Sequence, residues 1–278
     1  LLVADSQFAY PTVYQASFPH TFLSTEKSFS RWADAFKPRT RMMDTMQFRF
    51  DLPQEDEFAL CAATGRSPLL GQVFPRRAAF YDRYLTFSDV PAAVVETWQR
   101  ALVWFLQKLT YNDRRPLVLK SPPHTARVRL LLEVFPNARF VHISRDPYAV
   151  FQSTRHMYDT MVWHTYLQAP DTTAIDGDIL RRYTTMYDAY DTQRALIPPD
   201  QLHEVRYEDL ARDPLGELRQ IYQALGINGF ERAAPRLRAY VAGLRQYQPN
   251  EHRTLPEAVR ERVRRAWRQS FDRWGYNA

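Results

Sequence analysis

The sequence predicts an α/β domain in which a parallel sheet is flanked by helices. Three short and mostly apolar runs, residues 117–119, 140–143 and 202–205, have the length of buried strands. A stretch with apolar residues at helical spacing follows each of them. Strands that alternate with helices in this way are typical of parallel sheets with right-handed crossover helices.

Composition indicates one folded unit. The chain has 278 residues, of which 45% are hydrophobic and 14% are aromatic, so it can bury a sizeable core and is not a disordered protein. It contains no repeat and no obvious interdomain linker. We therefore expect residues 1–278 to form a single domain.

Charge and cysteine content narrow the partners and the compartment. The net charge of +6 suits an anionic ligand, although the arginine run at residues 260–268 is more typical of a solvated helix face. One cysteine, Cys61, excludes an internal disulfide and a multi-cysteine zinc site, and favours a reducing compartment such as the cytoplasm. No apolar run reaches the roughly 18 residues that a membrane span needs.

The first third of the chain is rich in aromatic residues. They are concentrated between residues 8 and 50, with short helices expected near 25–36. These side chains could line an acceptor pocket, and they are equally consistent with a core. Further on, a helix is predicted from Pro91 to about Leu109, because proline is favoured at the first helical position.

The first predicted strand, residues 117–119, ends in Lys120. A Ser-Pro-Pro breaker follows at 121–123, after which Thr125 is expected to cap a helix to about Phe135. The second strand ends in a similar way. Its last residues lead into Arg145, and Asp-Pro at 146–147 supplies the cap and first turn of a helix to about residue 158.

The third predicted strand ends near Tyr207, and a helical pattern covers residues 214–225. Lys120, Arg145 and Tyr207 thus all follow the carboxyl ends of strands. Ligands of open parallel sheets bind at these ends. The coincidence of three such residues predicts a binding site.

Two segments resemble the donor-binding core of the PAPS-dependent sulfotransferases of bacterial type. They are Val-Leu-Lys-Ser-Pro-Pro-His at 118–124 and Phe-Pro-Asn-Ala-Arg-Phe-Val-His-Ile-Ser-Arg-Asp-Pro at 135–147, followed by Val150 and Ser153. PAPS is 3′-phosphoadenosine 5′-phosphosulfate, a nucleotide sulfuryl donor. The resemblance implies a P-loop NTPase-like sulfotransferase architecture and direct in-line transfer to an acceptor hydroxyl, with no metal and no nucleic-acid partner.

The resemblance also implies a role for each matching residue. Arg145 and Ser153 would hold the 3′-phosphate of PAPS, for which the forked donors of a guanidinium are well suited. Lys120 would reach the oxygen that bridges the sulfuryl and phosphate groups, where negative charge develops during transfer. Tyr207, in a Tyr-Glu-Asp-Leu segment, would lie near the adenine. Towards the C-terminus, residues 245–252 match more loosely a segment that closes over the donor, which makes Arg245 and His252 candidate donor-binding residues.

The sequence leaves three candidates for the general base, the acidic residues at 55–57 and two histidines. Some sulfotransferases use a histidine two residues after the strand-end lysine, but that position is Pro122 here. Other branches use a carboxylate, and the chain offers adjacent acidic residues at 55–57. Glu55 and Glu57 would point about 200° apart on a helix, so one of them at most faces the crevice, and we favour Glu55.

Two histidines and a structural alternative complete the candidates for the base. His20 is the second candidate and His124 the third. The acidic residues at 55–57 are also what a helix start attracts, because the helix dipole stabilises negative charge there.

One motif of the family is missing. Sulfotransferases carry a glycine-bearing loop of Arg-Ser-Gly-Thr-Thr type that wraps the 5′-phosphosulfate, and it does not occur in these residues. The chain opens on Leu1, without Met, in what reads as the end of a helix. We therefore expect a domain that lacks its first strand and phosphate-binding loop, or else a protein that is not a competent enzyme.

Two other functions remain possible at this point. A small-molecule kinase of P-loop type would need Mg²⁺ held by a hydroxyl and a strand-end aspartate, and no strand ends in a lone aspartate. A non-catalytic basic module could bind nucleic acid or another polyanion through the arginines.

Overall fold

The computed structural model describes residues 1–33, 49–244 and 254–277. Two strands form a parallel sheet, β1 (Phe140–Ser144) and β2 (Leu202–Arg206). The α-helices, in chain order, are α1 (Val13–Ser17), α2 (Phe22–Ala33), α3 (Asp56–Thr64), α4 (Leu70–Val73), α5 (Ala78–Thr86), α6 (Ala92–Thr110), α7 (Val128–Val134), α8 (Pro147–Thr160), α9 (Ile175–Gln193), α10 (Tyr207–Arg212), α11 (Pro214–Ala224), α12 (Phe230–Gly243), α13 (Glu257–Ala266) and α14 (Arg268–Trp274).

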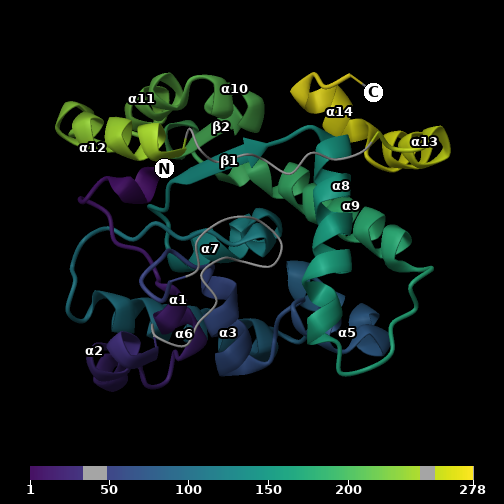
Figure 1. Cartoon of the computed structure of the whole chain (residues 1–278), viewed down its shortest axis with the longest axis horizontal. Coiled ribbons are helices and arrows are strands. Elements are labelled where there is room, and N and C mark those ends of the chain that lie inside the picture. The colour runs from purple at the N-terminus through teal and green to yellow at the C-terminus, as the bar shows by residue number, and fades with distance from the viewer. Residues whose placement is uncertain (34–48, 245–253, 278) are drawn as a thin grey trace.

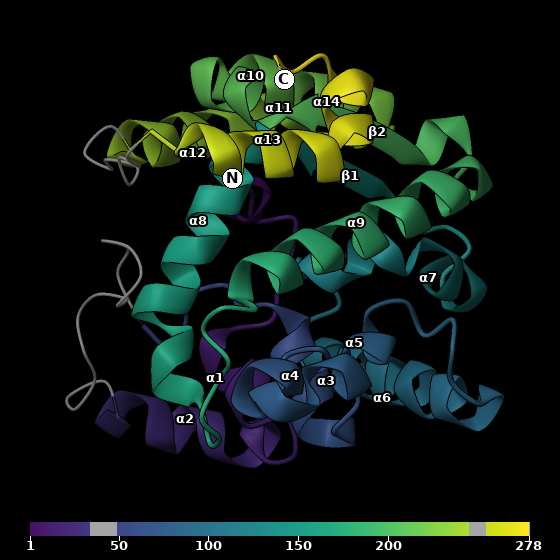
Figure 2. The same ribbon diagram turned by 90° about the vertical axis from the view of Figure 1, so that its right-hand side faces the viewer.

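The helices form two groups with the sheet close to one of them. Figure 1 shows β1 and β2 beside α10, α11 and α12, while α1 to α6 lie at the opposite end of the molecule. Figure 2 shows α8 and α9 running between the two groups. Helices therefore flank the sheet, as the alternation of strands and helices predicts.

Two of the three predicted strands are confirmed. β1 and β2 pair in parallel, with Phe140 opposite Leu202 at one end and Ser144 opposite Arg206 at the other. The long crossover between them contains α8 and α9. Parallel pairing requires such a connection, because the chain must return to the same end of the sheet.

The strand predicted at residues 117–119 is wrong. Among the described residues, Leu117 makes an isolated parallel bridge with Ala9 and belongs to no strand. The Ala9 N–H donates to the Pro116 carbonyl over 2.9 Å, and the Val118 N–H donates to the Ala9 carbonyl over 2.8 Å. Pro116 has no N–H to extend the ladder, and the prolines after Ser121 end it on the other side. Lys120 follows this single bridge, not a strand.

The predicted starts of α8 and α11 are confirmed, because the Asp146 and Asp213 side chains accept hydrogen bonds from the first turns of these helices. The start of α6 differs by one residue, since Pro91 is its N-cap and not its first helical residue. The helix expected over 125–135 is wrong at its beginning. A 3-10 helix, Pro122–Ala126, precedes α7, and Arg127 at the junction has backbone angles outside the helical region, φ −124° and ψ 23°.

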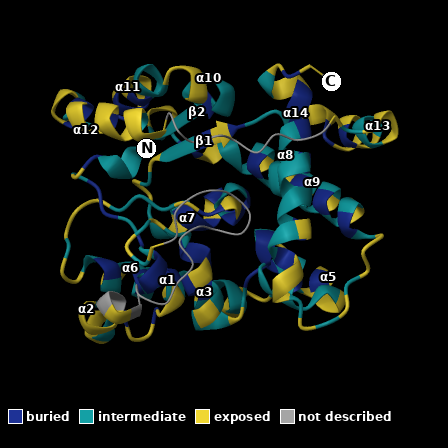
Figure 3. Ribbon diagram, viewed as in Figure 1, coloured by how far each residue is buried: buried dark blue, intermediate teal, exposed yellow. Residues whose placement is uncertain are grey.

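Buried clusters hold the first helical group together. Leu60 of α3 packs with Trp98 and Leu102 of α6 in one of them, and none of the three side chains is exposed. Burying one such side chain contributes about 1.5–3 kcal/mol. Figure 3 shows buried residues on α1, α3 and α7 and exposed ones along α2. No helix in the described ranges is long and apolar enough to cross a membrane.

Candidate active site

The first contact of the candidate site joins Lys120 to Glu55. The Lys120 Nζ donates to the Glu55 Oε1, and the two side chains are 75% and 22% exposed. Glu55 is the N-cap of α3, yet its side chain accepts no hydrogen bond from the first turn of that helix, all of which the structure describes. Its carboxylate turns to the lysine instead, which places an ammonium and a carboxylate together at an accessible position.

The next two carboxylates are completely buried. Asp56 accepts from the Ser121 Oγ over 2.8 Å and pairs with the His124 Nε2 over 2.7 Å. Glu57 pairs with the Arg127 guanidinium over 2.5 Å and 3.2 Å. The carboxylates at 55–57 therefore face three basic residues of one segment, and only the first of them is open to a ligand.

Glu57 is fixed by further contacts and is not placed to act as a base. The Ser67 hydroxyl donates to its Oε1 over 2.6 Å. Arg127 also donates to the Leu85 and Tyr84 carbonyls, over 3.2 Å and 2.5 Å. Both charged groups have no exposed surface, so an acceptor hydroxyl has no path to the Glu57 carboxylate.

The second contact of the candidate site joins Arg145 to Tyr207. Each is the first residue after the last paired position of its strand, and the Arg145 guanidinium carbon lies 4.4 Å from the centre of the Tyr207 ring. Within the described ranges, no carboxylate forms an ion pair with Arg145. Its charge is therefore available to an anion, whereas most arginines in these ranges pair with Asp or Glu.

Ser153 lies in α8, whose start is held firmly against α10. The Asp146 N–H donates to the Glu208 Oε1 over 3.0 Å, and the Tyr276 hydroxyl donates to the Glu208 Oε2 over 2.8 Å. The pKa of Glu208 is lowered: burial acts to raise it, but these hydrogen bonds outweigh burial. Glu208 thus ties the helix that carries Ser153 to the helix that begins with Tyr207.

The histidines proposed as bases occupy different surroundings. His20 is exposed and its ring packs 5.2 Å from the Trp104 ring of α6. In the part of the chain that the structure describes, no hydrogen bond or ion pair joins His20 to Lys120 or Glu55. His124 is mostly buried and pairs with the buried Asp56, so it lies on the interior side of the contact between Lys120 and Glu55.

Some predictions fall elsewhere. Arg245 and His252 lie outside the described residues. In the C-terminal arginine run, Arg264 and Arg265 pair with Glu261, and Arg268 pairs with Asp272. This pairing is typical of a solvated helix face and leaves little free charge for a polyanion.

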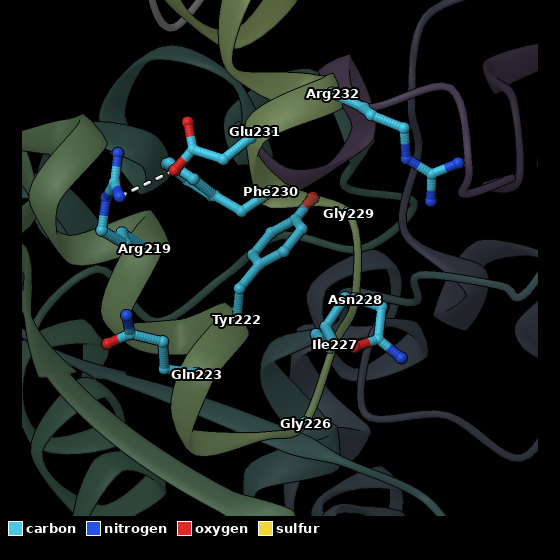
Figure 4. Close-up of a pocket in the computed structure, with 10 residues that line it drawn as sticks. All are labelled: Arg219, Tyr222, Gln223, Gly226, Ile227, Asn228, Gly229, Phe230, Glu231 and Arg232. Carbon is cyan, nitrogen blue, oxygen red and sulfur yellow. Dashed lines mark ion pairs between the residues drawn. The ribbon is translucent and has the colours of Figure 1, made fainter.

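A separate concavity of about 460 Å³ lies between α11 and α12. Figure 4 shows Arg219 and Glu231 paired across it and the Tyr222 ring beneath. The Tyr222 hydroxyl donates a hydrogen bond to the Asp5 carboxylate over 2.5 Å. None of the sequence-predicted site residues lines this concavity.

The sequence pattern does not predict Ser121 or Arg127 as partners of the carboxylates at 55–57. A signal was present, because three successive acidic residues are matched by Lys120, His124 and Arg127 within one short segment. Such complementary groups indicate that two segments pack together when the groups are buried.

Comparison with known proteins gives a consistent result. A family model described as the sulfotransferase family matches residues 1–232. The omega-hydroxy-beta-dihydromenaquinone-9 sulfotransferase Stf3 of Mycobacterium tuberculosis (strain CDC 1551 / Oshkosh) is 39% identical over 277 residues, which cover 100% of this chain and 71% of the relative. Carbohydrate sulfotransferase 6 of Homo sapiens is 27% identical over 156 residues, which cover 51% of this chain and 36% of the relative.

Solved structures share the fold at lower identity. The sulfotransferase STF9 from Mycobacterium avium matches with a TM-score of 0.70 and 19% identity, covering 98% of this chain and 71% of that one. The sulfotransferase STF1 from M. tuberculosis H37Rv matches with a TM-score of 0.68 and 19% identity, covering 94% and 71%. This likeness confirms the expected sulfotransferase architecture. Together with the family match over residues 1–232, it shows that the chain belongs to the sulfotransferase family and is an enzyme of sulfuryl transfer.

Proposed function

We propose that this enzyme moves a sulfuryl group from PAPS to the hydroxyl of a largely apolar acceptor, with Glu55 as general base and Lys120 at the leaving oxygen. The contact between these two side chains is the observation that carries the proposal. In-line transfer needs a proton acceptor on the side of the attacking hydroxyl and a positive charge on the leaving side. A paired carboxylate and ammonium supply both.

The proposed reaction balances without a covalent enzyme intermediate. The acceptor oxygen forms a bond to sulfur while the bond from sulfur to the bridging oxygen of PAPS breaks. The acceptor proton passes to Glu55, and the charge that develops on the leaving phosphate oxygen is stabilised by Lys120. Since 75% of the Lys120 side chain is exposed, its ammonium can turn from Glu55 to this oxygen.

Arg145, Ser153 and Tyr207 form the proposed donor-binding group. An arginine without a carboxylate partner favours a phosphate, and the Tyr207 ring at 4.4 Å holds the guanidinium plane in place. The Ser153 hydroxyl would complete the shell around the 3′-phosphate. The adenine would lie against Tyr207. Arg245 and His252 are retained as proposed donor contacts on sequence grounds alone.

An aromatic face supports the choice of an apolar acceptor. It consists of Tyr14, Phe18, Phe29 and Trp32, in which neighbouring ring centres lie 4.9–6.4 Å apart. Phe18, Phe29 and Trp32 are 41%, 44% and 67% exposed. A contiguous exposed apolar patch is typical of a ligand or interaction site.

The aromatic face is connected to Glu55 by a short stretch of chain. The Val13 N–H donates to the Leu52 carbonyl over 2.9 Å, and the Gln54 N–H donates to the Pro11 carbonyl over 2.8 Å. Residues 50–54 therefore run along α1 and lead directly into Glu55. The mycobacterial relative is named for an omega-hydroxy-dihydromenaquinone, and we propose for this chain, too, an apolar acceptor that carries a hydroxyl.

Calorimetric titration of 3′-phosphoadenosine 5′-phosphate into the full-length protein tests the donor assignment. We expect tight binding, weak binding of ADP, and a loss of about 10-fold to 100-fold in affinity for Arg145→Ala, since a charge-assisted contact is worth about 1.5–3 kcal/mol. Arg219→Ala is the matched control, because Arg219 pairs with Glu231 away from this group. Equal affinity for ADP would refute PAPS as the donor.

A further inference from the structure

A buried polar network lies directly behind the contact between Lys120 and Glu55. At its centre is Asp56, whose two carboxylate oxygens bind the Ser121 Oγ over 2.8 Å and the His124 Nε2 over 2.7 Å. The Ser121 Oγ also accepts the Glu57 N–H over 3.1 Å. Asp56 has no exposed surface, and Ser121 is 7% exposed.

Each half of the proposed catalytic pair is the chain neighbour of a network residue. Glu55 immediately precedes Asp56, and Lys120 immediately precedes Ser121. The hydrogen bond between Asp56 and Ser121 therefore joins the two chain segments one residue away from the contact between Glu55 and Lys120. The Lys120 side chain is itself 75% exposed, so packing does little to fix its position.

His124 completes this arrangement from the interior. Its ring meets Trp98 of α6 edge to face, at 6.4 Å between ring centres. Burial alone would raise the pKa of Asp56, but the charge and hydrogen bond of His124, with the Ser121 hydroxyl, lower it. Asp56 is therefore an ionised acceptor for both partners, and His124 Nε2 donates.

We propose that Asp56, Ser121 and His124 form a positioning unit that sets the separation of Glu55 from Lys120 for sulfuryl transfer, and that His124 is not the general base. This inference rests on the proposed catalytic roles of Glu55 and Lys120. The unit touches neither donor nor acceptor. It acts by holding two backbones at a fixed distance, and catalytic geometry is sensitive to shifts of about 1 Å.

The test compares kcat and KM in the full-length enzyme for Ser121→Ala, His124→Ala and His124→Gln. We expect Ser121→Ala and His124→Ala to lower kcat by about 10-fold to 100-fold, with the affinity for 3′-phosphoadenosine 5′-phosphate unchanged. A glutamine places its amide nitrogen near the position of the His124 Nε2, so His124→Gln should recover most of the kcat.

Tyr222→Phe is the matched control, because it removes a buried hydrogen bond to a carboxylate, Asp5, at a distance from the site. It should lower the melting temperature to a similar extent and leave kcat unchanged. Wild-type kcat in folded Ser121→Ala and His124→Ala would overturn the positioning role. Failure of the wild-type enzyme to use PAPS would instead refute the proposed function, so the two failures are distinct.

Discussion

Lys120 and Glu55 are 65 residues apart in the sequence, and their side chains are in direct contact. Glu55 comes from the start of α3, and Lys120 from the extended segment that pairs with Ala9. The buried residues that follow each of them bind one another. The contact is therefore a property of two packed segments, and its removal should affect the reaction more than the fold.

Replacing Lys120 should slow the chemical step. Lys120→Met removes the charge that we propose stabilises the leaving oxygen, and we expect kcat to fall by about 100-fold to 1000-fold. Lys120→Arg should retain more activity, since the charge is kept. Steady-state turnover assays with PAPS measure kcat. Lys108→Met, which removes a lysine that binds the Pro19 and His20 carbonyls, is the control, and an equal loss there would contradict the assignment.

Glu55→Gln should also lower kcat while leaving the protein folded. An amide cannot take up the proton of the acceptor hydroxyl. General-base catalysis contributes a factor of about 100 to 10,000 to the rate. Because Glu55 precedes α3 and its side chain makes no capping hydrogen bond, the melting temperature should change little. Glu57→Gln gives the opposite pattern, a lower melting temperature through its buried contact with Arg127. Activity that survives in Glu55→Gln would transfer the role of base to another group, with His20 tested next.

The Glu57–Arg127 pair should be essential to stability. Arg127→Ala leaves a buried carboxylate without its partner, and we expect the free energy of unfolding to fall by about 3–5 kcal/mol. Urea denaturation measures this loss. A double variant, Glu57→Leu with Arg127→Met, should be less destabilised than Arg127→Ala, because no unpaired charge remains. Equal stability of wild type and Arg127→Ala would contradict the buried pair.

The aromatic face should determine the affinity for an apolar acceptor. Phe29→Ala and Trp32→Ala remove exposed rings, so we expect a higher KM for a long-chain alcohol and an unchanged KM for PAPS. Tyr111→Ala is the control, since Tyr111 is 75% exposed at the end of α6 and outside this face. The assay measures sulfated product by mass spectrometry. A rise in the KM of PAPS alone would exclude this face as the acceptor surface.

Stability should decrease as the pH falls through the range in which His142 titrates. The ring stacks on Tyr190 at 4.3 Å, and burial lowers the pKa of His142 from 6.5 to about 4, although Glu204 opposes this shift. Between these values the unfolded chain binds a proton that the folded chain does not, so the contribution is present above pH 6.5 and is lost towards pH 4. It amounts to about 3 kcal/mol.

Urea denaturation at several pH values measures this dependence. His142→Phe keeps a ring between Tyr190 and Trp274 and removes the titration, so its stability should depend less on pH between 6.5 and 4 than that of the wild type. Identical slopes in the two proteins would contradict the role of His142.

The elements that the sequence predicts well are those governed by local chemistry. Asp146 and Asp213 cap helices with their own side chains, and both precede a proline, so the starts of α8 and α11 follow from a few neighbouring residues. The apolar run of β1 is similarly clear. Residues 117–119 are also apolar, but among the described residues their one bridge is to Ala9, and a partner so distant along the chain leaves no local signal.

The site shows the same division. Lys120, Arg145 and Tyr207 are recognisable because each follows a short apolar run. The contact of Lys120 with Glu55, and the burial of Glu57 against Arg127, depend on how α3 packs. The sequence offers both carboxylates as candidates, and helical periodicity cannot choose between them, because Glu55 precedes the helix.

The register of the two strands fixes the positions of the residues that follow them. Ser144 and Arg206 are paired, so Arg145 and Tyr207, the next residue after each strand, lie side by side. A single inserted residue within either strand would rotate one of these side chains to the opposite face of the sheet. An insertion in the crossover after α8 leaves this pairing unchanged, so chains of different length can keep Arg145 beside Tyr207.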